Sequence, residues 1–215
     1  MNTIITIGRQ YGSGGREIGR RLAEIYGIPF YDKELLKIAA KESGLCEEMF
    51  ENYDEKPTSS FLYSLVMDPY SLGMHSTGFE MPLNQKVFLA AFDTIKKLAE
   101  KGPCVIVGRC ADYALADHPE LLNIFIQASL EFKKARIRDE YQIPEDKIKS
   151  YATQMDKQRA SYYNYYTSRK WGDARNYDLC LDSSVFGIEG TVELIEKAVS
   201  IKEKSHIENM KNKNE

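Results

Sequence analysis

The sequence predicts an α/β protein in which a parallel sheet of five strands is covered by helices on both faces. Short apolar segments alternate along the chain with longer amphipathic ones, and this order is typical of parallel sheets. The segment 104–107 is wholly apolar, as expected of a strand buried on both faces. A glycine cluster between the first strand and the first helix is the third observation. The expected strands comprise residues 4–7, 28–32, 104–107, 122–126 and 177–181.

The amphipathic segments between these strands predict the helices. In the first helix, Ile18, Leu22 and Ile25 share one face, and Gly27 marks its end. Asp32 is well suited to cap the second helix. The further helices are expected over residues 33–41, around 87–98, after Ser129, after Pro144 and over 188–199.

Length and composition fit one soluble domain. A chain of 215 residues accommodates an α/β domain with an insertion or a lid. Hydrophobic residues make up 43% and charged residues 28%, which is ordinary for a globular protein. The net charge of −3 argues against bulk nucleic-acid binding, because no global positive field gathers phosphates. Any basic site must therefore be local.

Cysteine spacing and the amino terminus predict a cytoplasmic protein. The four cysteines lack C-x-x-C spacing and are interpreted as reduced thiols rather than a disulfide framework or a zinc site. The first residues lack the charged and apolar regions of a signal peptide and are interpreted as a strand. No apolar run approaches the roughly 18 residues of a membrane span. We therefore expect no membrane association.

The glycine cluster at residues 8–16 is the leading candidate for a phosphate site. Gly12, Gly14 and Gly15 are more glycines than a plain turn between a strand and a helix needs. Small residues let backbone N–H groups surround an anion, and the following helix adds unpaired N–H donors and the positive end of its dipole. Phosphate binding is therefore favoured over a plain turn.

This cluster departs from the P-loop pattern G-x-x-x-x-G-K-[ST]. Gly15 stands where the lysine would be, and Arg16 stands where the serine or threonine would be. By analogy with the loss of one preorganised donor, the missing lysine costs about 10²- to 10³-fold in rate unless another cation replaces it. Arg9 and Arg16 are the nearest candidates in sequence.

Two charged residues follow strands at the edge where ligands gather in open α/β sheets. Asp32 ends the second strand, so it can face the glycine loop as well as cap the next helix. Arg109 follows the third strand and is placed to hold an anion or the edge of a nucleobase. It could instead pair with Asp112, but ligand contact is favoured.

Two segments lie outside the expected core. Residues 45–82 are irregular and are interpreted as an insertion with short helices that closes over one side of the site. Its apolar residues could equally form a homo-oligomer contact. These residues are Met67, Met74, Phe79 and Met81. The single domain of residues 1–215 is thus divided into a core (1–44, 83–142 and 176–203), an insertion (45–82), a lid (143–175) and a polar tail (204–215).

The predicted lid lies in a locally basic region. Residues 133–175 contain eleven of the 29 lysines and arginines against six acids, together with a cluster of tyrosines. Asp156 and Arg159 lie three residues apart on one helical face, and Arg169 and Arg175 follow. A basic, aromatic segment suits a lid that closes on phosphates and excludes water. The alternative is a solvated basic helix whose aromatic residues pack on the core.

Together these motifs resemble the P-loop nucleoside monophosphate kinases, and among them the cytidylate kinase-like family. The similar segments are Gly12-Ser-Gly-Gly15, Ile106-Val-Gly-Arg109, Asp156-x-x-Arg159 and Leu181-Asp-Ser-Ser184. The chain carries Gly-Gly-Arg and Gly-Arg-Cys where that family's cytidylate kinases carry Gly-Lys-Ser and Gly-Arg-Asp. The resemblance implies a three-layer P-loop kinase-like fold with a five-stranded parallel sheet, an insertion of the monophosphate-binding type and a helical lid.

The resemblance also implies phosphoryl transfer from ATP or another nucleoside triphosphate to a small acceptor, with a nucleoside monophosphate as the leading candidate. Mg²⁺ is expected from this reaction class. Its ligands stay open, with Ser13 and Glu17 as candidates. The donor phosphates would contact Arg9, Gly12, Ser13, Gly14, Gly15 and Arg16. The acceptor would contact Asp32, Arg109, Asp112 and Asp156. The catalytic cations would be Arg16, Arg159, Arg169 and Arg175.

Two other functions stay open at this point. A nucleotide-binding sensor or regulatory protein with little kinase activity would explain the missing lysine and hydroxyl of the glycine loop. A kinase for a non-nucleotide hydroxyl compound would use the same donor site with a different acceptor.

Overall fold

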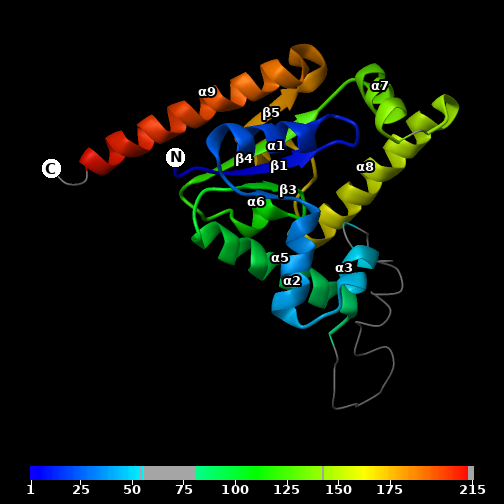
Figure 1. Ribbon diagram of the computed structural model, residues 1–215, viewed down its shortest axis with the longest axis horizontal. Coiled ribbons are helices and arrows are strands. Elements are labelled where there is room, and N and C mark those ends of the chain that lie inside the picture. The colour runs from blue at the N-terminus through cyan, green and yellow to red at the C-terminus, as the bar shows by residue number, and fades with distance from the viewer. Residues whose placement is uncertain (54, 56–80, 142, 213–215) are drawn as a thin grey trace.

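The computed structural model describes residues 1–53, 55, 81–141 and 143–212, and its centre is a five-stranded parallel sheet (Figure 1). The strand order is β2-β3-β1-β4-β5. The strands are β1 (Ile4–Arg9), β2 (Phe30–Tyr31), β3 (Val105–Val107), β4 (Leu121–Gln127) and β5 (Leu179–Asp182). The predicted fold class, an α/β protein with a five-stranded parallel sheet, is confirmed.

The helices flank the sheet and continue beyond one end of it (Figure 1). Within the described residues they are α1 (Gly15–Tyr26), α2 (Lys33–Ser43), α3 (Glu47–Tyr53), α5 (Leu83–Glu100), α6 (Ala111–Ala114), α7 (Leu130–Tyr141), α8 (Glu145–Thr167) and α9 (Ser183–Asn212), with a 3₁₀ turn at Ala174–Asn176. The α9 helix is interrupted at Gly187, whose backbone is not helical. Of the predicted insertion, residues 54 and 56–80, including Met67, Met74 and Phe79, lie outside the described residues.

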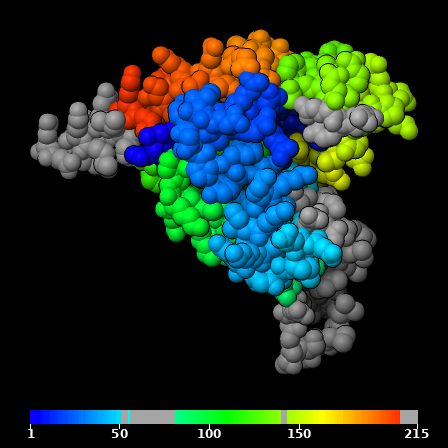
Figure 2. All heavy atoms as spheres, in the orientation of Figure 1, coloured from blue at the N-terminus to red at the C-terminus, as the bar shows by residue number. Residues whose placement is uncertain are grey.

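The two faces of the sheet carry separate apolar cores. On one face, Ile5 and Ile7 of β1 pack with α1 and α9. On the other face, Ile4 and Ile106 pack with α2 and α5. Figure 1 shows α1 and α9 above the sheet and α2, α5 and α6 below it. In the space-filling view, α1, α2 and α3 form a continuous surface in blue to cyan (Figure 2). The three-layer arrangement follows from the alternation of side chains along each strand.

The α1 helix packs through smaller residues than its sequence pattern suggests. Ile18 and Leu22 are fully buried as predicted, but the prediction that Ile25 shares their buried face is wrong, because Ile25 is 52% exposed. A Cβ at Gly19 would lie 3.0 Å from Ile7 Cδ1, so the helix lies close against the sheet at Gly19. The buried face is therefore centred between Ile18 and Ala23, which turns Ile25 outward.

The parallel register brings the ends of the central strands to one edge. Ile7 of β1 is level with Val107 of β3 and with Ile124 of β4. The loops after β1 and β3 therefore start side by side, and α7 and α8 stand at this end of the sheet (Figure 1). In open parallel sheets this edge is where ligands bind.

No helix in the described part of the chain combines the length and the apolarity needed to cross a membrane.

Candidate active site

The glycine loop between β1 and α1 is fixed by contacts that exclude larger residues. Gly12 and Gly14 have φ values of 75° and 79°, which residues with a side chain rarely adopt. A Cβ at Gly12 would lie 2.9 Å from the Ile137 side chain, and one at Gly14 would overlap Ile188. At Gly15 it would lie 2.6 Å from Arg9 Cβ. All three glycines are therefore required by the conformation of the loop.

This loop leaves backbone donors at the start of α1. Gly14 is the N-cap of α1 and makes no side-chain capping bond. The first N–H groups of a helix have no partner within it, so an anion can accept hydrogen bonds from them. The loop itself is held from outside: Ser183 Oγ donates to the Ser13 carbonyl at 2.6 Å, and Ser13 Oγ donates to the Gln10 carbonyl at 2.8 Å. These contacts suit a preformed anion cradle.

Two cations lie beside the loop, and neither was among the residues predicted for it. Lys133 of α7 is 8% exposed. A Cβ added at Gly12 would lie 3.3 Å from the Lys133 Cβ. Arg136, one turn further on, lies close to Gly14 and pairs with Glu17 through Nη2 at 2.9 Å. Lys133 and Arg136 therefore lie against the glycine loop, at Gly12 and Gly14.

A lid residue contacts the same loop. Asp156 of α8 accepts a hydrogen bond from the Tyr11 N–H at 2.6 Å and pairs with Lys133 Nζ at 3.3 Å. One carboxylate thus contacts both a main-chain amide of the loop and the neighbouring ammonium. Asp156, predicted to bind the acceptor, lies at the glycine loop.

Asp32 and Arg109 meet at the ends of β2 and β3. Arg109 Nη1 lies 3.2 Å from Asp32 Oδ1 and 3.2 Å from the Val107 carbonyl. Arg16 Nε lies 2.6 Å from the other Asp32 oxygen. Asp32 is the N-cap residue of α2, but its carboxylate makes no capping hydrogen bond. The side chain of Asp32 therefore binds arginines.

Arg9, Arg109 and Arg159 converge on one carboxylate, that of Glu55. Arg9 Nη1 lies 2.7 Å from Oε1, and Arg9 Nη2 lies 3.3 Å from Oε2. Arg159 Nε lies 3.2 Å from Oε2, and the Arg109 main-chain N–H donates to Oε1 at 3.2 Å. The side chains of Arg9, Glu55 and Arg159 are 11%, 15% and 13% exposed. This cluster lines a small hollow with Gly108, Cys110, Asp112, Tyr163 and Tyr177.

The charges of this cluster perturb one another. Burial alone would raise the pKa of the Glu55 carboxyl, but attraction by Arg9, Arg159 and Arg109 outweighs it and holds that pKa well below its usual range. Burial and repulsion from Arg9 together lower the pKa of the Arg159 guanidinium. Positive charge is thus concentrated here and is compensated by an internal anion.

Asp112 lies in the wall of the same hollow and accepts a hydrogen bond from Tyr163. The Tyr163 hydroxyl lies 2.6 Å from Asp112 Oδ2, and both side chains are buried. Burial raises the pKa of the Asp112 carboxyl, and the hydrogen bond from Tyr163 acts against this rise. Asp112 does not pair with Arg109 in a hydrogen bond or an ion pair that the structure records between described residues.

We predict that Tyr163→Phe lowers the free energy of unfolding by about 1–3 kcal/mol at neutral pH, because it leaves a buried carboxylate short of a donor. The loss should be smaller near pH 4, roughly the usual pKa of a carboxyl, since a raised pKa means that the folded state then favours the neutral form. Urea denaturation at both pH values measures it, with Tyr151→Phe on the same helix as the control. An equal loss at both pH values would contradict this account.

Arg169 and Arg175, the other predicted catalytic cations, are not brought into this cluster. Arg169 lies over the Tyr113 ring, 5.2 Å from its centroid. Arg175 pairs with Asp173 at 2.6 Å, and its side chain is 87% exposed. The sequence-based candidates to replace the lysine are also directed elsewhere, because Arg9 points to Glu55 and Arg16 points to Asp32.

The oxygen atoms considered as magnesium ligands already contact other groups of the protein. Asp32 and Glu17 are each paired with two arginines, and the Ser13 hydroxyl donates to the Gln10 carbonyl. In the part of the chain that the structure describes, no three His, Cys, Asp or Glu residues cluster as metal ligands. Mg²⁺ commonly binds through substrate phosphates and water with few protein ligands.

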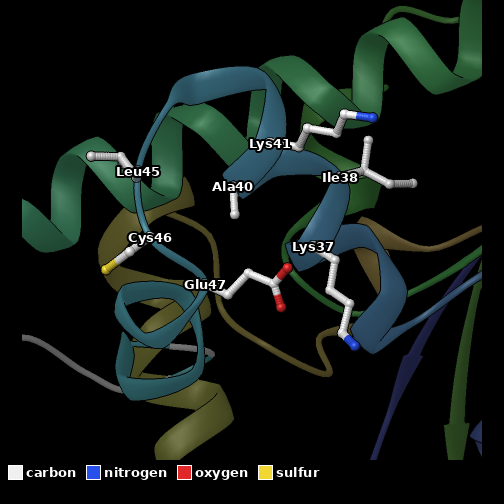
Figure 3. Close-up of a pocket in the computed structure, with 7 residues that line it drawn as sticks. All are labelled: Lys37, Ile38, Ala40, Lys41, Leu45, Cys46 and Glu47. Atoms are coloured by element: carbon white, nitrogen blue, oxygen red, sulfur yellow. The ribbon is translucent and has the colours of Figure 1, made fainter.

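A second, more open hollow lies away from these groups, between α2 and α3 (Figure 3). None of its lining residues is a predicted site residue, and Figure 3 shows that they come from α2, the start of α3 and the loop between them. They are Lys37, Ile38, Ala40, Lys41, Leu45, Cys46 and Glu47. The predicted site residues that the structure describes therefore lie outside this hollow.

Comparisons with known proteins identify the family to which the chain belongs. The sequence profile of the cytidylate kinase-like family matches residues 4–185. A protein named cytidylate kinase from Methanopyrus kandleri is 25% identical over 208 residues, covering 93% of this chain and 94% of that protein. Another from Methanococcus vannielii is 24% identical over 200 residues, covering 91% of this chain and 99% of that protein.

Solved structures show the same architecture. An uncharacterized protein from Eubacterium ventriosum has a TM-score of 0.70 and 30% identity, covering 92% of this chain and 98% of that chain. Shikimate kinase from Bacteroides thetaiotaomicron has a TM-score of 0.54 and 13% identity, covering 93% of this chain and 99% of that chain. At this identity the similarity shows the fold alone. The parallel sheet and the glycine loop define the class as P-loop kinase-like. This chain belongs to the cytidylate kinase-like family.

Proposed function

We propose that this protein transfers the γ-phosphoryl group of ATP to a nucleoside monophosphate. The observation that carries the proposal is that a glycine cradle for anions and a three-arginine cluster lie at the same edge of the sheet, and that Arg9 connects them. Arg9 is the last residue of β1 and leads into the loop, while its guanidinium belongs to the cluster. Phosphoryl transfer needs mainly positioning and charge neutralisation, which these two features can supply.

The donor end of the reaction would use the glycine loop. The main-chain N–H groups at the start of α1 would bind the phosphates of ATP, which enters as its magnesium complex. Lys133 and Arg136 would replace the missing P-loop lysine, since both are basic side chains that lie against the loop. Asp156, which holds Lys133 and the Tyr11 N–H, would position the ammonium.

The acceptor end would use Arg109, with Asp32 orienting its guanidinium. Arg159 would act at the transferring group, because its Nη1 donates to the Arg9 carbonyl at 3.2 Å while its Nε faces the acceptor side. It therefore lies between the two halves of the site. An arginine here can spread its charge over the equatorial oxygens of the transferred group.

A nucleoside monophosphate is the favoured acceptor for two reasons. The arginine cluster suits a phosphate monoester better than an uncharged hydroxyl compound. The two archaeal relatives are named cytidylate kinase, so cytidine 5′-monophosphate is the first acceptor to test.

The test is a coupled assay of ADP release from magnesium-ATP across the nucleoside monophosphates, with non-nucleotide hydroxy acids such as shikimate and gluconate as a second panel. We expect acceptor-dependent ADP release with one or more monophosphates. Turnover with the second panel alone would show that the acceptor is a non-nucleotide hydroxyl compound and not a nucleoside monophosphate. Tight ATP binding with no acceptor-dependent turnover would instead identify a nucleotide-binding regulatory protein.

A further inference from the structure

We propose that the carboxylate of Glu55 occupies the position of the acceptor's phosphate group and competes with it, so that Glu55 sets the affinity for a dianionic acceptor. The inference rests on the proposed function for its assignment of the acceptor side. It adds an internal ligand, one of the chain's own side chains, which the acceptor must displace.

The first argument is the number of donors on one carboxylate. Glu55 accepts from Arg9 Nη1 and Nη2, from Arg159 Nε and from the main-chain N–H of Arg109, at 2.7 to 3.3 Å. Two hydrogen bonds from one arginine, joined by bonds from a second guanidinium and a main-chain amide, are typical of the way proteins bind phosphate or carboxylate ligands. A phosphate monoester has three terminal oxygens and would use the same donors with less crowding.

The second argument is the backbone that presents the amide. Gly108, Arg109 and Cys110 have φ values of 75°, 54° and 56°, and Glu55 itself has a φ of 50°. Within this run the Gly108 N–H donates to the Ile7 carbonyl, and the Arg109 N–H is directed at the Glu55 carboxylate. A positive φ is unfavourable in residues other than glycine and is kept where the surroundings impose it. Three of these four residues are not glycine, and all of them border the same anion position.

The third argument is charge. Arg9, Arg109 and Arg159 bring three positive charges into a largely buried space, of which Asp32 compensates one through Arg109. Glu55 supplies one negative charge, whereas a phosphate monoester supplies nearly two at neutral pH. The dianion therefore complements the cluster better than the carboxylate does. A neutral acceptor would gain nothing by displacing Glu55.

The test compares the wild type with Glu55→Gln, Glu55→Asp and the control Glu203→Gln. Glu203 also accepts several hydrogen bonds, from Thr3 and from the Asn2 N–H, but it lies far along the chain in α9. Melting temperature is measured with and without inorganic phosphate at constant ionic strength. Dissociation constants for cytidine 5′-monophosphate and for cytidine are measured by calorimetry in the absence of ATP.

We expect Glu55→Gln to melt at a lower temperature than the wild type without phosphate, and phosphate to raise its melting temperature by more than it raises that of the wild type. Its dissociation constant for the monophosphate should fall about tenfold, because removing an internal competitor raises the binding-competent fraction. The dissociation constant of Glu55→Asp should lie between those of the wild type and Glu55→Gln. Glu203→Gln should lose stability without any change in its response to phosphate, and cytidine affinity should not change in any variant.

Equal or weaker monophosphate binding by Glu55→Gln would overturn the inference, since Glu55 would then support the arginines rather than occupy the ligand's position. If Glu55→Gln does not fold, the comparison passes to Glu55→Asp, and a dissociation constant equal to that of the wild type overturns the inference. These readouts need no turnover. If the variants bind phosphate more tightly but show no kinase activity, the inference that Glu55 occupies an anion site stands and the proposed kinase function is rejected.

Discussion

Replacing Arg159 with lysine is expected to lower kcat on the order of 10³-fold in the proposed kinase reaction, by comparison with arginines that act on transferring phosphoryl groups. Arg159 connects the two halves of the site, through Glu55 on one side and the Arg9 carbonyl on the other. Lysine keeps the charge but loses the planar fork that can bind two oxygens at once. Steady-state kinetics with magnesium-ATP and the best monophosphate measures the effect.

The matched control for Arg159→Lys is Lys157→Ala, which removes a cation from an exposed position of the same helix. Its kcat should stay within about twofold of the wild type, as is usual for surface changes away from a site. A fall in kcat of less than tenfold for Arg159→Lys would mean that Arg159 orders the substrate-free protein without acting on the transferred group.

Replacing Lys133 with methionine is expected to lower kcat/KM for ATP by about 10²- to 10³-fold, the usual effect of removing one preorganised donor from a developing charge. Lys133 is buried beside Gly12 and is held by Asp156, so its ammonium is fixed near the loop. Methionine retains the length of the side chain and much of its packing. The effect should appear with ATP as the varied substrate, and the KM for the acceptor should change little.

Lys134→Met provides the control for this prediction. Lys134 is the next residue of α7, and it pairs with Glu131 on the outer side of the helix. Its kinetics should resemble those of the wild type. Equal losses for Lys133→Met and Lys134→Met would show that α7 contributes only general positive charge, and Arg136 would then be the remaining candidate for the role of the missing lysine.

The sheet and most helices could be predicted because their signals are local. Unbroken apolar strands such as Val105–Val107 and periodic helices such as Leu83–Glu100 are readable within one window of sequence. The orientation of a helix about its own axis is not local. Ile25 satisfies the helical period of Ile18 and Leu22, but the close approach at Gly19 sets which side of α1 meets the sheet. That approach depends on strands distant in sequence.

The candidate site was predictable in part for the same reason. Asp32 and Arg109 end strands, and their meeting follows from parallel topology alone. The assignment of Arg9 and Arg16 to the donor phosphates depended on closeness in sequence, whereas both side chains reach across the sheet edge to acids. The roles of these residues, and the division of the chain into core, insertion and lid, stay predictions.

Lys133 and Glu55 were missed for different reasons. Lys133 had a weak signal, since it precedes Arg136 by three residues on the helix that follows β4 and therefore faces the ligand edge with it. Glu55 had none, because it is one acid among several in an irregular segment. Its importance comes only from the three arginines that fold around it from β1, the loop after β3, and α8.

The most direct measurement of the central proposal is the product balance of a reaction of magnesium-ATP with cytidine 5′-monophosphate or the best acceptor of the panel, followed by chromatography of the nucleotides. The proposed phosphoryl transfer predicts that the acceptor's diphosphate and ADP form in equal amounts, and that neither forms when the acceptor is left out. Release of ADP with inorganic phosphate alone, or the absence of any product across all monophosphates, would contradict it.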